Sequence, residues 1–163
     1  MMEQAVRELR GEPAEAEVEP EIQLGIPAYI PEGYVPDVSQ RLVFYKRLAA
    51  IRGVPDLDEI AAELVDRYGP VPPLVDTLMR LMELRRWLKD LRVVTARRRG
   101  ERIVLEFAPH TSVRAERLLE TVQRSRGRLR LLDGSTLAVV PEATDHEGTI
   151  AEVRTLLQSL STA

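Results

Sequence analysis

The chain has 163 residues, of which 44% are hydrophobic and 30% charged, a balance typical of one globular domain and unlike that of a disordered chain. A net charge of −3 and an aromatic content of 4% argue against a dedicated nucleic-acid-binding protein, which needs a positive field or exposed rings for stacking. The absence of cysteine excludes disulfides and cysteine-ligated metals, and without a long apolar run or a signal-peptide pattern we expect a cytoplasmic protein that does not enter a membrane.

The first part of the chain is predicted to be a tail that precedes the main domain. Residues 2–10 have the spacing of a short helix, and the acidic segment 12–21, with its prolines, is typical of a flexible linker. A short strand is expected next, because Ile22, Leu24 and Ile26 alternate with polar or small residues.

A proline-rich connector, residues 28–36, follows this strand. Each proline fixes its own φ and biases the preceding residue toward extended geometry, so the connector should be stiff. Because Tyr34 and Val35 offer apolar anchors and the prolines reduce the entropy lost on docking, we expect the connector to be ordered against the domain.

The first helix of the main domain is predicted to begin at the cap residue Asp37 and to stop near Gly53. It is amphipathic, and its spacing places on one side Val38, Leu42, Tyr45 and Ala49.

The next helix has well-marked ends. Asp56 is its predicted cap, Glu59 is in a capping-box relation to Asp56, and Gly69 followed by Pro70 ends it. The face expected to belong to the core carries Leu57, Ile60, Ala61, Leu64, Val65 and Tyr68. A longer helix is opened by Pro72 and Pro73 and runs through Leu91. It is apolar over so wide an arc that we expect it to be the central helix, with neighbours on several sides.

Two β-hairpins are predicted in the second half of the chain. The first covers residues 94–107 and turns at Arg99 and Gly100, since apolar and polar residues alternate on both sides of the turn. The second turns at Asp133 and Gly134, a pair that tolerates the positive φ of a tight turn.

A helix over residues 112–123 separates the hairpins, and a final helix starts at Asp145. The sequence therefore predicts an α+β fold, in which a helical amino-terminal half precedes two β-hairpins that form a small antiparallel sheet with packed helices. The predicted division is a tail and connector over 1–36 and the main domain over 37–163.

No enzyme motif is recognisable. A phosphate-binding loop needs Gly followed by Lys, which does not occur here, and there is no Gly-x-Ser-x-Gly motif. His110 and His146 lack a second metal ligand at helical or hairpin spacing. We therefore expect a non-catalytic protein with no cofactor, metal or small-molecule substrate.

Two arginine-rich stretches offer one alternative, an accessory module that contacts nucleic acid through its hairpins. The candidate contacts are Arg97, Arg98, Arg99, Arg102, Arg128 and Arg130. Arginines at strand edges and turns also keep sheets soluble, and no exposed aromatic residues accompany these. We expect at most weak, sequence-independent binding.

The helix after residue 56 carries charged residues opposite its apolar face, namely Glu59, Glu63, Asp66 and Arg67. Charged outer faces are ordinary, so spacing alone favours a solvated surface. A mixed-sign patch of this kind could also dock a partner.

Two stretches resemble the carboxy-terminal domain of the bacterial transcription-repair coupling factor, the Mfd family. The first is Ile30-Pro31-Glu32-Gly33-Tyr34-Val35-Pro36-Asp37-Val38, which leads into Arg41-Leu42-Val43-Phe44-Tyr45-Lys46-Arg47-Leu48. The second is Glu63-Leu64-Val65-Asp66-Arg67-Tyr68-Gly69, which follows the family pattern Glu-Leu-aliphatic-Asp-Arg-aromatic-Gly. The resemblance covers nearly the whole chain, although the hairpins match less specifically.

The resemblance implies a regulatory domain of a larger protein, an ATP-dependent DNA translocase of nucleotide excision repair. In that family the motor, the DNA contacts and the RNA polymerase contacts lie upstream, and residues 1–36 would include the end of the motor lobe. The carboxy-terminal domain packs on a UvrB-like module of the same chain and hides the surface that binds UvrA. The resemblance places Glu63, Asp66 and Arg67 at the centre of that interface, with Glu59 nearer its rim.

Overall fold

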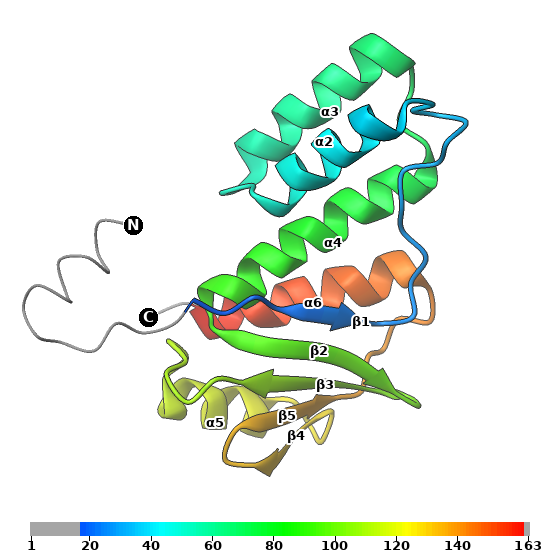
Figure 1. Ribbon diagram of the computed structural model, residues 1–163. Coiled ribbons are helices and arrows are strands. Elements are labelled where there is room, and N and C mark those ends of the chain that lie inside the picture. The colour runs from blue at the N-terminus through cyan, green and yellow to red at the C-terminus, as the bar shows by residue number, and fades with distance from the viewer. Residues whose placement is uncertain (1–16, 162–163) are drawn as a thin grey trace, which may run out of the picture.

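The structure, a computed structural model, describes residues 17–161 (Figure 1). The helix predicted over 2–10 and the first part of the predicted linker lie outside the described residues. The last residues of that linker pack on a helix, because Val18 is buried and Glu19 Oε2 accepts a hydrogen bond of 2.7 Å from Arg85 Nη2. This hydrogen bond lowers the pKa of Glu19, and the charges of Lys89 and Arg85 add to the effect. Residues 17–20 are therefore anchored and do not behave as a free linker.

The amino-terminal half consists of helices α2 (Val38–Ala49), α3 (Val54–Tyr68) and α4 (Pro73–Asp90). Asp37 caps α2 as predicted, since its Oδ1 accepts the Ser39 N–H at 2.8 Å. The side of α2 that faces the core differs from the predicted apolar side. Phe44 and Leu48 are buried, whereas Val38 and Leu42 are more than half exposed.

Helix α3 begins earlier than predicted. Gly53 is the cap residue, and Asp56 lies in the first turn, where its Oδ2 accepts the Arg52 N–H at 2.8 Å. The prediction of Asp56 as the cap is therefore wrong. Pro55 explains the earlier start, because its fixed φ suits the first helical turn and its missing N–H would have no partner there.

The connector is ordered against the helices, and this prediction is confirmed. Val35 is fully buried, and the Ile30 N–H donates to the Tyr45 hydroxyl at 2.7 Å. The Tyr34 hydroxyl donates at 2.8 Å to the carbonyl of Gly69. Gly69 ends α3, as predicted, and has a φ of +90°. Burial raises the pKa of Tyr34, and Tyr68 raises it further. The connector thus joins the start of α2 to the end of α3.

The carboxy-terminal half is built on one sheet of five strands. They are β1 (Glu21–Gln23), β2 (Val93–Arg99), β3 (Arg102–Phe107), β4 (Leu129–Asp133) and β5 (Thr136–Val139). Their order is β1-β2-β3-β5-β4, and the two predicted hairpins supply all strands except β1. Strand β1 runs parallel to β2, so the sheet is mixed and not purely antiparallel. The predicted α+β class is confirmed.

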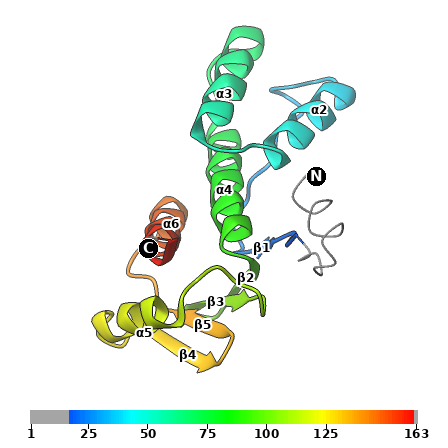
Figure 2. The ribbon, with the colours of Figure 1, turned by 90° about the vertical axis from the view of Figure 1, so that its left-hand side faces the viewer.

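Helix α4 belongs to two hydrophobic cores, as expected of the central helix. Val75 and Leu78 lie in the core shared with α2, α3 and the connector, whereas Leu84 and Leu88 lie in the core under the sheet. Helix α6 (His146–Ser161) lies beside α4 on the same side of the sheet, and α5 (Ala115–Arg124) lies near β4 (Figure 2). Asp145 starts α6, since its Oδ1 accepts the Gly148 N–H.

The buried connector predicts a measurable contribution to stability. We expect Val35→Ala to lower the free energy of unfolding by about 2 kcal/mol, because it removes two methyl groups from a fully buried site. The matched control is Val38→Ala, three residues on and 57% exposed, which should change it by less than about 0.5 kcal/mol. Urea unfolding followed by circular dichroism measures both. Equal effects of the two substitutions would contradict the buried position of the connector.

Candidate docking site between helices α2 and α3

The four charged residues predicted on α3 divide into two pairs. Glu59 and Asp66 are exposed and make no hydrogen bond or ion pair with any residue of 17–161. Glu63 and Arg67 lie one turn apart on the flank of α3 that faces α2, and both contact α2. The candidate surface therefore includes the seam between the two helices as well as the outer side of α3.

Glu63 lies at the centre of a network across this seam. Its Oε2 accepts from Arg47 Nη1 of α2 at 2.9 Å and from Arg67 Nη1 at 3.3 Å. Arg67 Nη2 also donates to Gln40 Oε1 of α2 at 3.2 Å. Arg67 is thus held from both helices.

A buried aromatic ring lies beneath these charges. The Cζ atoms of Arg47 and Arg67 lie 5.5 and 5.7 Å from the centroid of the Phe44 ring, which is fully buried. Arg67 also lies 5.1 Å from the Tyr68 ring, and the Phe44 and Tyr68 rings meet edge to face. Guanidinium groups are attracted to aromatic faces at such distances. We refer to Gln40, Phe44, Arg47, Glu63 and Arg67 as the seam cluster.

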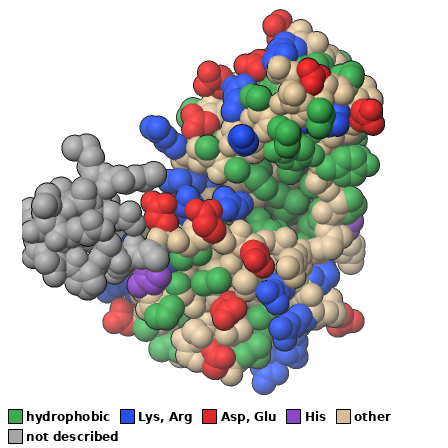
Figure 3. Space-filling view, in the orientation of Figure 1, with side chains coloured by type: hydrophobic (Ala, Val, Ile, Leu, Met, Phe, Trp, Pro, Cys, Tyr) green, Lys and Arg blue, Asp and Glu red, His purple; other side chains and the backbone are tan. Residues whose placement is uncertain are grey.

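The seam cluster fixes geometry more than it adds stability. The side chains of Arg47, Glu63 and Arg67 are 33%, 38% and 41% exposed, and ion pairs at such exposure contribute under about 1 kcal/mol each. Two guanidiniums donate to one oxygen of the Glu63 carboxylate, while the exposed carboxylates of Asp66 and Glu59 lie nearby on α3. Acidic and basic side chains are interspersed over this end of the molecule (Figure 3). Such a surface favours orientation and specificity in binding.

Sequence reasoning missed Gln40 and Arg47. Both lie on α2, outside the helix that carries the predicted site, and their spacing of seven places them on one side of α2. That spacing was the available signal, but it does not show which side of α2 packs against α3.

The structure separates the six candidate arginines. One row of paired residues crosses four adjacent strands and consists of Arg97, Val104, Ala138 and Arg130. It lies on the sheet face opposite to that of the buried Ile103 and Leu105. Arg99 and Arg102 are paired on the same face, near the hairpin turn. Arg98 pairs with Ile103 and so alternates to the other face.

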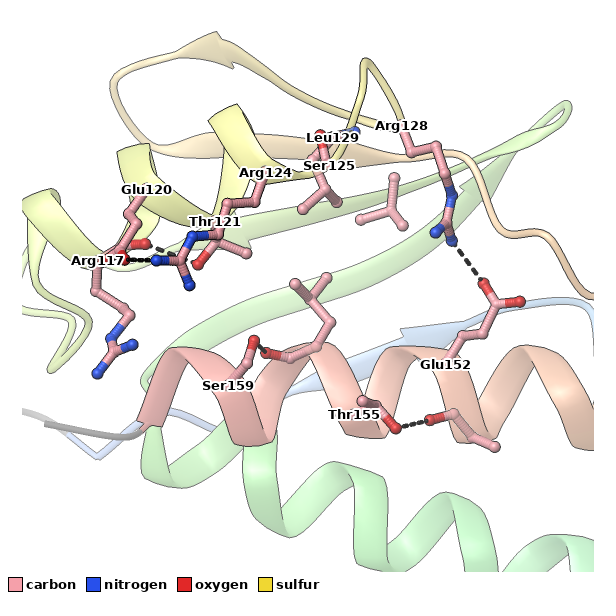
Figure 4. Close-up of a pocket in the computed structure, with 13 residues that line it drawn as sticks. Arg117, Glu120, Thr121, Arg124, Ser125, Arg128, Leu129, Glu152, Thr155 and Ser159 are labelled. Atoms are coloured by element: carbon pink, nitrogen blue, oxygen red, sulfur yellow. Dashed lines mark hydrogen bonds and ion pairs between the residues drawn. The ribbon is translucent and has the colours of Figure 1, made fainter.

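Arg128 lies apart from that row and is engaged in ion pairs with Glu142 at 3.2 Å and Glu152 at 3.1 Å. It borders a cavity of about 500 Å³ between α5 and α6, with an apolar floor that includes Leu129 and Val139. Figure 4 shows polar side chains of both helices around this cavity. The charges at its rim are compensated, since Glu120 pairs with Arg124 at 2.7 Å and Glu152 pairs with Arg128. This arrangement offers no unpaired charge to an ionic ligand at these positions.

Among residues 17–161, no group of three or more His, Asp or Glu side chains could hold a metal ion. No helix in the same range combines the length and the apolar character needed to cross a membrane.

Comparison with known proteins adds to this geometry. The TRCF domain model matches residues 24–118. The transcription-repair-coupling factor of Myxococcus xanthus is 36% identical over 162 residues, which are 99% of this chain and 14% of that protein. That of Escherichia coli is 30% identical over 140 residues, which are 86% of this chain and 12% of that protein.

A solved structure has the same fold. The crystal structure of the C-terminal domain of transcription-repair coupling factor superposes with a TM-score of 0.78 at 20% identity, and the match covers 90% of this chain and 94% of that one. The fold is thus that of a small α+β domain. The chain belongs to the TRCF domain family, which confirms the resemblance found in the sequence. It spans about a seventh of the length of the Myxococcus xanthus relative, and what matches is a small domain and not the motor part.

The placement of the arginines predicts how strongly this chain binds nucleic acid. We expect a dissociation constant for a short DNA duplex no tighter than about 10⁻⁴ M at physiological salt, because the chain is acidic overall and the basic row is short. Lower salt should strengthen binding. At low salt, Arg130→Gln should weaken binding, whereas Arg128→Gln should not, because Arg128 is ion-paired. Fluorescence anisotropy measures both. Tight binding at physiological salt would instead support the nucleic-acid alternative.

Proposed function

We propose that this chain is the non-catalytic, autoinhibitory domain of a transcription-repair coupling factor. It packs on the UvrB-like module of its parent protein through the seam cluster and the neighbouring outer side of α3. In this position it acts as a clamp that masks the UvrA-binding surface until the domain is released from that module. The parent would contact RNA polymerase and DNA through its upstream domains and would supply the ATP-dependent translocation.

The observation that carries the proposal is the fixed, mixed-sign surface at the family motif 63–69. Glu63 and Arg67 are held by contacts to α2, and Asp66 is exposed beside them without a partner among residues 17–161. Side chains that are already ordered lose less entropy on binding. Because each exposed ion pair adds little affinity, such a surface suits an interface that must open again.

The position of the surface in the fold also supports the proposal. Helices α2 and α3 lie beyond α4, on the side away from the sheet, whereas β1 lies at the sheet edge (Figure 1). In the proposed parent, the motor lobe would precede the chain near β1. The docking surface would then remain free to reach a second module.

The structure determines which substitution tests the proposal best. Reversing Glu63 to Arg would place a third guanidinium beside Arg47 and Arg67, so its effect on binding would be mixed with a local rearrangement. Asp66 has no such contacts and lies in the last turn of α3, where a positive charge is favourable. Asp66→Arg is therefore the cleaner change.

We expect Asp66→Arg to weaken binding to the UvrB-like module of the Myxococcus xanthus relative by about tenfold or more, because it reverses an exposed charge at the interface centre. Isothermal titration calorimetry with this chain measures the effect. The corresponding change in the full-length relative should increase UvrA capture.

The control is Glu101→Arg, the same charge reversal in the turn of the first hairpin, which should leave binding unchanged. A folded Asp66→Arg variant that binds the module like the wild type, with basal UvrA capture, would show that the proposed interface is wrong.

A further inference from the structure

The two contacts of the Glu63 carboxylate within the seam cluster use the same oxygen. Arg47 Nη1 and Arg67 Nη1 both donate to Oε2, at 2.9 and 3.3 Å. Oε1 accepts no hydrogen bond from any residue of 17–161. The carboxylate is thus held by one oxygen while the other remains available, and the side chain is 38% exposed.

Of the two donors, only Arg47 reaches Glu63 from another helix. Arg67 is one turn from Glu63 on α3, so this pair moves with α3 and does not fix Glu63 relative to α2. Arg47 makes that link, and its guanidinium also lies over the buried Phe44 ring. Gln40 makes the corresponding link from α2 to Arg67.

We infer that Arg47 of α2 is a positioning residue of the docking surface, which holds Glu63 so that Oε1 faces the partner and Arg67 keeps its place over Phe44. The inference rests on the proposed function, because the partner is the UvrB-like module proposed above. It extends the surface from α3 to α2 and assigns a role to a residue outside the motif 63–69.

A competing role for Arg47 predicts the opposite effect. If Arg47 only neutralised Glu63, its removal would free the carboxylate and strengthen binding to a basic partner group. If Arg47 positions Glu63, its removal leaves the side chain to sample several rotamers, and this freedom must be lost again on binding. The free Oε1 favours positioning, because Glu63 can accept from a partner without giving up Arg47.

The experiment measures binding of the Myxococcus xanthus UvrB-like module to this chain and to its variants Arg47→Gln, Glu63→Gln and the double variant. We expect Arg47→Gln to weaken binding by about fivefold or more and Glu63→Gln by at least as much. In the double variant, Arg47→Gln should add little to the effect of Glu63→Gln, because both remove the same interaction. Arg47→Lys should restore part of the affinity, because an ammonium can still donate to Oε2.

Two controls separate positioning from a loss of fold. Melting temperatures of the single variants should stay within about 4 °C of the wild type, since a half-exposed ion pair contributes little to stability. Arg154→Gln breaks another ion pair between two helices, to Glu83 of α4, at a similar arginine exposure of 39%, and should leave binding unchanged. Wild-type or tighter binding by Arg47→Gln, or additive effects in the double variant, would overturn the inference.

A second readout needs no partner. The side-chain N–H signals of Arg67 in ¹H–¹⁵N spectra should shift or broaden in Arg47→Gln, because Arg47 then no longer fixes Glu63, the acceptor of one Arg67 hydrogen bond. They should stay unchanged in Arg154→Gln. If the wild-type chain does not bind the module, the proposed function is wrong, and these spectra still decide the role of Arg47. Unchanged Arg67 signals in Arg47→Gln would then overturn it.

Discussion

Helix α4 contributes side chains to both hydrophobic cores of the molecule. One end, with Val75 and Leu78, completes the core of α2, α3 and the connector, and the other, with Leu84 and Leu88, completes the core under the sheet. The main helical contacts of α2 and α3 are with each other and with α4. Because the two cores contain different parts of α4, this helix sets the orientation of the candidate docking surface relative to the sheet.

Within the helical half, one buried and two partly buried aromatic rings lie beneath an exposed charged surface. Tyr34 of the connector contacts Tyr68, Tyr68 contacts Phe44, and the guanidiniums of Arg47 and Arg67 lie over Phe44. Surface arginines usually lose considerable side-chain entropy when they are fixed, which cancels much of the energy of an ion pair. Here the rings provide a rigid base, so the charges have fixed positions although each pair is weak.

Structural features that depend on neighbouring residues could be predicted from the sequence, whereas features that depend on contact with a distant segment could not. The cap at Asp37, the end of α3 at Gly69 and both hairpin turns follow from neighbouring residues, and all are observed. The parallel pairing of β1 with β2 joins residues more than seventy positions apart, so no local pattern indicates it. The same limit applies to the site: helical spacing grouped Glu63 with Asp66 on an outer face, but Glu63 contacts α2 instead.

The difference between the seam cluster and the cavity between α5 and α6 shows which kind of site can support regulated docking. At the cavity rim, carboxylates meet guanidiniums in closed pairs, and Glu152 also accepts the backbone N–H groups of Glu142 and Ala143. A partner would have to break these contacts. In the seam cluster the internal contacts leave Oε1 of Glu63 available, and the carboxylate of Asp66 is available beside it, so a partner can add contacts without breaking any. In the proposed clamp, affinity then depends on a few half-exposed contacts, and a modest competing interaction elsewhere in the parent protein would suffice to open it.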